Sequence, residues 1–158
     1  MISMGLDIST CTGICVLEDG EVIMEKVITF PKKTGFQRVQ AIADVILTEA
    51  LILKPDIVMV EGYAYGNANT LATLVTIGAV VRWALYASDM LWYDVPPTSL
   101  KKYMGKGNLT KDEVRLAVYK KWGYEHKSND VVDAYVLARM GEAQHVSVDL
   151  LQGCAKGY

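Results

Sequence analysis

The sequence lacks the marks of several whole classes of protein. It has no unbroken apolar run approaching the roughly 18 residues of a membrane-spanning helix, so we expect no membrane insertion. Its three cysteines are too few for a disulfide framework, and Cys11 and Cys15 lie close together, which indicates free thiols in a reducing compartment. The N-terminus has neither the basic start nor the apolar stretch of a signal peptide. We therefore expect a cytoplasmic protein without repeats, linkers or a targeting segment.

What is present is the balance of a globular domain. Of the 158 residues, 51% are hydrophobic and 22% are charged, which is typical of a folded protein and not of a disordered one. We expect one domain over residues 1–146, followed by a flexible tail over residues 147–158, where structural signals are few.

Charge is distributed unevenly along the chain. The formal net charge is −2, but residues 98–127 carry eight basic and three acidic side chains, a net charge of +5 that leaves −7 elsewhere. One concentrated basic segment in a mildly acidic protein can bind an anion locally. A solvated helical face explains such a run equally well, so the charge alone does not decide between the two.

Hydrophobic spacing and turn signals predict an alternation of strands and helices. We expect strands over residues 2–9, 13–17, 21–30, 56–61 and 91–95. We expect helices over residues 36–53, 70–88, 110–122 and 130–144, with a short helical turn at 99–104. The predicted fold is α/β: a five-stranded mixed sheet, three antiparallel strands then two parallel ones, with helices on both faces.

Four carboxylates stand where apolar residues would be expected. Asp7 lies inside the first apolar strand, and Glu61 ends the fourth strand after four consecutive apolar residues. Asp130 and Asp133 are three positions apart, so they share one face of an otherwise apolar helix. A carboxylate beside the core is unfavourable unless it is paired or holds a metal, although either strand acid alone is more often a hydrogen-bonded structural residue.

These acids converge if the first and fourth strands are neighbours and the last helix packs over their ends. Such a set of hard oxygen ligands suits Mg²⁺ or Mn²⁺. Two ions about 4 Å apart would activate a water molecule and stabilise the leaving oxygen in phosphodiester cleavage. His126 and His145 are far apart in sequence and no cysteine spacing suits zinc, so we expect no rival metal site.

The segments around the acids resemble those of a known family. They are Gly5-Leu6-Asp7-Ile8-Ser9 with Thr12-Gly13, Val60-Glu61-Gly62, and Asn129-Asp130-Val131-Val132-Asp133-Ala134. In this order they resemble the RuvC-type Holliday-junction resolvases of the RNase H-like superfamily, from residue 4 to about residue 141. The resemblance implies an RNase H-like fold with a two-metal site that takes Mg²⁺, with Mn²⁺ as a substitute. The catalytic, metal-binding residues would be Asp7, Glu61, Asp130 and Asp133.

The resemblance also implies a partner. A homodimer with one active site per subunit would nick a four-way DNA junction symmetrically, leaving 5′-phosphate and 3′-hydroxyl ends. We expect it to act at a nucleoid or in a phage-infected cell, and an organelle is not excluded. The sequence does not show whether branch-migration machinery is a partner. The helix at 70–88 is apolar around most of its circumference, which either complete burial or a dimer face explains, and the resemblance favours the dimer.

The DNA-contacting residues follow from the same resemblance. The basic candidates are Lys101, Lys102, Lys106 and Lys111, of which Lys111 would contact the scissile phosphate at the active site. The family's best-known members stack a phenylalanine on a junction base three residues after the second acid. Here that position is Ala64, and Tyr63 or Tyr65 beside it can stack instead.

Three other functions stay open. The run Asp7-Ile8-Ser9-Thr10 also resembles the first phosphate loop of sugar-kinase and actin-like proteins, which bind ATP between two such domains. A RuvC-like fold can also bind branched nucleic acid without cutting it, or take part in RNA processing. The pI of about 5.7 and the altered aromatic loop keep open a third alternative, a debranching endonuclease that acts on forks and flaps as well as junctions.

Overall fold

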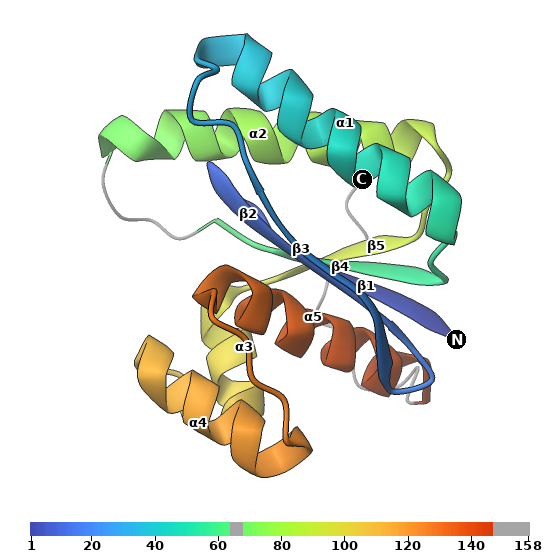
Figure 1. The fold of residues 1–158 in the computed structure, drawn as a ribbon, viewed down its shortest axis with the longest axis vertical. Coiled ribbons are helices and arrows are strands. Elements are labelled where there is room, and N and C mark those ends of the chain that lie inside the picture. Colours follow the sequence, from blue (N-terminus) through green and yellow to red (C-terminus); the bar gives the residue numbers. More distant parts are fainter. Residues whose placement is uncertain (64–67, 147–158) are drawn as a thin grey trace.

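A five-stranded sheet lies at the centre of the molecule (Figure 1). The computed structural model describes residues 1–63 and 68–146; the predicted tail and Tyr65 lie outside them. The strands are β1 (Ile2–Asp7), β2 (Cys11–Glu18), β3 (Glu21–Thr29), β4 (Ile57–Glu61) and β5 (Trp92–Val95). The helices are α1 (Gly35–Leu53), α2 (Ala68–Ala87), α3 (Pro97–Met104), α4 (Lys111–Trp122) and α5 (Asn129–Val146).

The strand order is β3-β2-β1-β4-β5, which confirms the predicted mixed sheet. β1 pairs antiparallel with β2 and parallel with β4, and β4 pairs parallel with β5. The β2–β3 turn is Asp19-Gly20, with positive φ angles of 49° and 91°, the conformation that makes Asp-Gly a strong hairpin signal. β1 is therefore the central strand, hydrogen-bonded on both sides.

Helices cover both faces of the sheet. Figure 1 shows α1 and α2 on one face and α5 on the other, with α3 and α4 beyond it. Met4 and Leu6 of β1 lie in the core beneath α1 and α2. Because side chains alternate along a strand, Ser3, Gly5 and Asp7 are on the face that α5 covers.

Some predicted boundaries shift for local reasons. α3 begins at Pro97, two residues earlier than predicted, because proline at a first helical position presets φ and leaves no N–H unsatisfied. β2 begins at Cys11, also two residues early, since Cys11 still pairs with Thr29 of β3. The predicted capping box of α4 is present: Glu113 N–H donates to Thr110 Oγ1, and Thr110 N–H donates to the Glu113 carboxylate at 2.7 Å.

α2 has one buried face and one exposed face. Ile77, Val81 and Leu85 are buried in the core, whereas Trp83 and Tyr86 are 69% and 71% exposed. Complete burial, one of the two explanations for its apolar circumference, is therefore wrong. Within residues 1–63 and 68–146, no helix combines the length and hydropathy that crossing a bilayer requires.

Candidate active site

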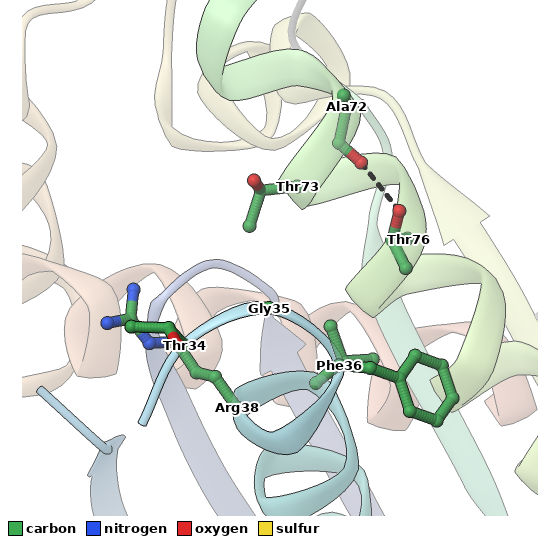
Figure 2. A pocket seen from close by; sticks show the side chains of 8 residues that line it. Thr34, Gly35, Phe36, Arg38, Ala72, Thr73 and Thr76 are labelled. Atoms are coloured by element: carbon green, nitrogen blue, oxygen red, sulfur yellow. Dashed lines mark hydrogen bonds between the residues drawn. The ribbon is translucent and has the colours of Figure 1, made fainter. Parts of the chain in front are cut away.

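Two hollows on the described surface are separate from the predicted site. A pocket of about 350 Å³ lies between the N-terminal parts of α1 and α2 (Figure 2), and its polar walls are three threonines and Arg38. The Arg38 guanidinium already has a hydrogen-bond partner, because its Nε donates to the Lys33 carbonyl at 2.6 Å. A second pocket of about 300 Å³ lies between α4 and residues 124–126. Neither includes any of the four predicted carboxylates.

Asp7 and Glu61 end neighbouring parallel strands at one edge of the sheet. β1 and β4 are paired through Leu6 and Val60, and the two acids are the next residue of each strand. Their side chains turn toward α5 and lie close enough to influence each other's pKa, and Asp7 is only 8% exposed. The expectation that the first and fourth strands are neighbours is confirmed.

α5 reaches this edge because two glycines leave room for its backbone. A Cβ atom on Gly5 would lie 1.9 Å from the Ala134 carbonyl oxygen, and one on Gly13 would lie 2.0 Å from the Asp130 carbonyl oxygen. Any side chain at either position would push the helix away from the sheet. The close approach brings Asp130 and Asp133, in the first turns of α5, to the ends of β1 and β4.

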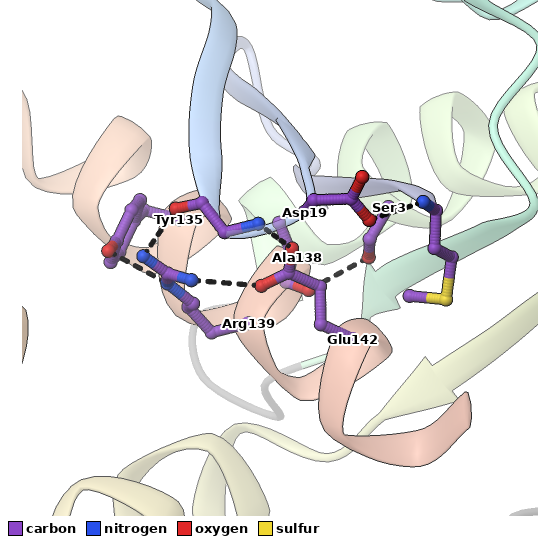
Figure 3. Close-up of polar contacts among 8 residues, drawn as sticks. Ser3, Asp19, Tyr135, Ala138, Arg139 and Glu142 are labelled. Atoms are coloured by element: carbon purple, nitrogen blue, oxygen red, sulfur yellow. Dashed lines mark hydrogen bonds and ion pairs between the residues drawn. The ribbon is translucent and has the colours of Figure 1, made fainter. Parts of the chain in front are cut away.

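The other end of α5 is fixed to the β2–β3 turn (Figure 3). Arg139 Nη2 donates to the Gly20 carbonyl at 2.6 Å, and the Gly20 N–H donates to Glu142 Oε1 at 2.6 Å. Arg139 and Glu142 also form an ion pair at 3.0 Å, and Arg139 Nε donates to the Tyr135 hydroxyl at 2.8 Å. These bonds anchor the C-terminal half of α5 to the hairpin turn, whereas the close packing on Gly5 and Gly13 sets the position of its acidic N-terminal turns.

The four acids Asp7, Glu61, Asp130 and Asp133 form what we call the acidic edge. Burial, and then the charge of Glu61, raise the pKa of Asp7 well above its ordinary value. Burial also raises the pKa of Glu61, and the neighbouring Asp7 carboxyl partly offsets that rise. The pKa of Asp133 is raised to about 7, by burial and then by the charge of Asp7. Burial and like charge therefore favour the protonated forms of Asp7, Glu61 and Asp133 in the absence of a cation.

Two of the four predicted lysines face the acidic edge. Lys111, at the first position of α4, has its Nζ 4.0 Å from Asp130 Oδ1, and its charge lowers the pKa of the other three acids. Lys101 of α3 lowers the pKa of Glu61 in the same way. The Lys111 side chain is 61% exposed, so its ammonium can also pair with an arriving phosphate. Lys102 and Lys106 are exposed on the surface, in and just after α3.

The sequence reasoning missed two further side chains that lie against Asp130 of the acidic edge. Burial, and then the Asp130 carboxylate, raise the pKa of the Cys11 thiol, and Ser128 Oγ donates to Asp130 Oδ2 at 3.3 Å. Cys11 lies in the predicted turn after the first strand, four residues from Asp7, and that proximity was the available signal. Ser128 directly precedes α5.

Tyr63 is held against α2. Its hydroxyl accepts a hydrogen bond from Arg82 Nη1 at 3.2 Å and donates to the Val75 carbonyl at 3.4 Å. The Arg82 guanidinium also lies 4.7 Å from the centroid of the Tyr63 ring. To stack on a base, the tyrosine ring would have to leave these contacts. Tyr65, the other predicted stacking residue, lies outside the described residues.

The acidic edge suits a divalent cation in its chemistry. As the side chains stand, no three His, Cys, Asp or Glu residues are gathered as a ready metal site in the part of the chain that the structure describes. The donor set nevertheless fits a hard cation, because carboxylates from two strands and a helix are buried against like charge. A cation would offset the repulsion between these carboxylates.

The strand order and the helix packed across β1 define an α/β fold that this chain shares with solved RuvC structures. Among solved structures, Thermus thermophilus RuvC is 24% identical with a TM-score of 0.73, over 89% of this chain and 97% of that one. T. thermophilus RuvC in complex with a Holliday junction substrate is 20% identical with a TM-score of 0.78, over 98% of both chains. Fowlpox virus resolvase in complex with Holliday junction DNA is 13% identical with a TM-score of 0.60, over 89% of this chain and 98% of that one.

Sequence comparison adds nothing to this likeness. No known protein-family profile matches the chain, and no curated protein sequence does. The resemblance to the RuvC-type resolvases is therefore confirmed at the level of the fold.

Proposed function

We propose that this chain is a divalent-metal-dependent endonuclease that resolves four-way DNA junctions. The observation that carries the proposal is the acidic edge: four carboxylates from β1, β4 and α5, three of them with raised pKa values, in the fold of RuvC. Buried like charges disfavour folding unless they serve to bind a cation, so a structural role alone explains them poorly.

The chain contributes position and charge to the reaction. Asp7, Glu61, Asp130 and Asp133 would hold two Mg²⁺ or Mn²⁺ ions, which supply an activated water and stabilise the leaving oxygen in phosphodiester hydrolysis. Strand ends and the closely packed α5 hold the carboxylates in place before DNA arrives, which limits reorganisation during the reaction. Lys111 is placed to pair with a non-bridging oxygen of the scissile phosphate.

The segment from α3 to α4 would bind the DNA backbone. Lys101 and Lys111 stand beside the acidic edge, and Lys102 and Lys106 extend the basic surface away from it. Lysines that neutralise phosphates release condensed counterions, so junction binding should weaken steeply with added salt.

We further propose that two copies associate through the exposed side of α2. Val75, Trp83 and Tyr86 are exposed on that helix, with Val75 about two turns before Trp83 and Tyr86 about one turn after it. A two-fold dimer would present two acidic edges to the symmetric strands of a junction. Sedimentation should show a dimer that Trp83→Ser converts to a monomer, and an unchanged sedimentation coefficient would contradict this interface.

The experiment that tests the function is cleavage of a labelled four-way junction in Mg²⁺ or in EDTA, beside a linear duplex and a Y-fork. Asp7→Asn, purified in parallel, reports any contaminating nuclease. Paired nicks confined to the junction and dependent on Mg²⁺ would support a resolvase. Tight junction binding without any cutting would contradict it and favour a binding module.

One observation favours a second candidate, a debranching endonuclease. The Tyr63 hydroxyl is hydrogen-bonded to α2, so its ring is not available to stack on a base. Without that stacking contact, the chain would have one interaction fewer with which to select a junction sequence. The Y-fork lane separates the two: cutting of forks at a rate similar to junctions would move the assignment to the broader activity.

A further inference from the structure

Arg82 of α2 joins three segments behind the acidic edge. Its Nε and Nη2 donate to Asp94 Oδ1 of β5 at 2.9 and 2.5 Å, and Nη2 also donates to the Glu61 carbonyl at 3.2 Å. Its Nη1 donates to the Tyr63 hydroxyl, and the guanidinium lies over the Tyr63 ring. One side chain thus binds the last residue of β4, the segment that follows it, and the neighbouring strand.

These bonds approach Glu61 from behind. Val60 packs in the core under α1 and α2, so the next side chain, Glu61, turns to the opposite face of the sheet, where it meets Asp7. Arg82 reaches the Glu61 main-chain carbonyl from the α2 face. The carboxylate is therefore free for a ligand while the backbone that carries it is held.

The local sequence keeps space for this arginine. A Cβ atom on Gly78, one turn before Arg82, would lie 2.5 Å from Arg82 Nη1 and 2.6 Å from the Tyr63 hydroxyl. The Arg82 side chain is only 12% exposed, and a charge so far withdrawn from water is tolerated because every guanidinium nitrogen has a partner. Burying α2 does not require it, since Ile77 and Val81 already fill the core.

We propose that Arg82 is a positioning residue that fixes the end of β4 and, through it, the Glu61 carboxylate for metal binding. The inference rests on the proposed function, in which Glu61 is a metal ligand. The planar fork of arginine can serve Asp94, the Glu61 carbonyl and Tyr63 together, whereas the single ammonium of lysine cannot span all three.

Arg82→Met tests this directly, because methionine roughly keeps the reach of the side chain and removes every donor. In a Mn²⁺ titration of the DNA-free protein, followed by calorimetry, we expect the midpoint to rise on the order of tenfold. Junction cleavage at saturating metal should slow on the order of ten- to a hundredfold, with junction affinity in EDTA within about twofold of wild type. Arg82→Lys should be intermediate, and Gly78→Ala, which keeps Arg82 but takes its space, should reproduce part of the loss.

Arg139→Met is the matched control. Arg139 is also a partly buried arginine that joins separate elements, but it acts at the far end of α5. It should lower the melting temperature and leave the Mn²⁺ midpoint and the cleavage rate unchanged. If Arg82→Met lowers the melting temperature and does not move the midpoint, its role is structural and the inference is overturned.

The metal titration also separates the two proposals. A wild-type chain that binds Mn²⁺ but cuts no junction would contradict the proposed function, while the midpoint of Arg82→Met would still decide the role of Arg82. A wild-type chain that binds no divalent ion would overturn both.

Discussion

The acidic side chains at the two ends of the central strand β1 differ in whether they have partners of opposite charge or hydrogen-bond donors. At its N-terminal end two acids have donors: Asp19 pairs with the N-terminal ammonium at 2.6 Å, and Asp56 accepts a main-chain N–H of β1 at 2.7 Å. Glu142 completes that end by pairing with Arg139. At the C-terminal end Asp7 and Glu61 face each other, and burial raises the pKa values of both.

The interactions at the N-terminal end stabilise the fold, whereas the repulsion between the acids at the C-terminal end does not. The paired end is complete within the chain, and its bonds hold the β2–β3 turn to α5. The carboxylates of the acidic edge still repel one another, although the exposed Lys111 ammonium lies 4.0 Å from Asp130. A cation from solution and a phosphate from DNA would complete it, which is why we place the activity there.

The largest expected effect comes from removing one charge of the acidic edge. Asp7→Asn should lower junction cleavage by more than about a hundredfold, because it would delete one of the proposed metal ligands. Junction affinity should stay within about twofold, since no lysine is lost. The metal-free protein should also melt at a higher temperature than wild type, because the repulsion with Glu61 is relieved. Gel-based cleavage, titration binding and calorimetry check these outcomes, and loss of binding together with cleavage would indicate misfolding.

The opposite result is expected at the paired end. Arg139→Met should destabilise the fold by about 1–3 kcal/mol, because it removes charged hydrogen bonds from Gly20, Glu142 and Tyr135. Urea unfolding measures the loss, and cleavage well below the melting temperature should be unchanged. A cleavage defect as large as that of Asp7→Asn would break the proposed division between the two ends.

The pH dependence of stability should report the acidic edge. Carboxyls with raised pKa values bind protons more tightly in the folded than in the unfolded chain, so the metal-free fold loses stability as the pH rises. The loss should begin near pH 4, about where unfolded carboxyls titrate, and continue through about 7, the pKa of Asp133. Melting temperatures in EDTA should fall across this window, with a shallower fall for Asp7→Asn and after Mg²⁺ addition. Equal slopes for wild type and Asp7→Asn would contradict the assignment.

The smallest effect is expected for Lys111→Ala. It should slow cleavage several-fold and reduce the salt slope of junction binding by about one, as expected for one lost phosphate contact. Lys120→Ala, an exposed lysine in the last turn of the same helix, is the charge-matched control and should leave the cleavage rate unchanged. If the two variants behave alike, Lys111 has no special place at the acidic edge.

Local patterns were enough to predict the sheet and the acids. Asp7 and Glu61 are conspicuous because a charge interrupts an apolar strand, and Asp-Gly marks the hairpin without reference to the rest of the chain. What the sequence did not reveal depends on distant partners. Arg139 binds a turn 119 positions away, and Tyr63 is held by Arg82, 19 positions along, so neither contact leaves a periodic signal. In the sequence, Gly78 and Arg82 were only interruptions of an apolar helix.

The close packing of α5 on Gly5 and Gly13 also determines when, during synthesis and folding, the four acids come together. Asp7 is in the first strand, Glu61 becomes its neighbour only when β4 pairs with β1, and the remaining acids arrive with the helix of residues 129–146. During synthesis the N-terminal segments emerge first, and the β1–β3 meander can form early because its pairings are local. A nascent chain therefore has an incomplete set of acids until α5 has left the ribosome and docked on Gly5 and Gly13. Under the proposed function, the site for cutting DNA would be complete only once folding is finished.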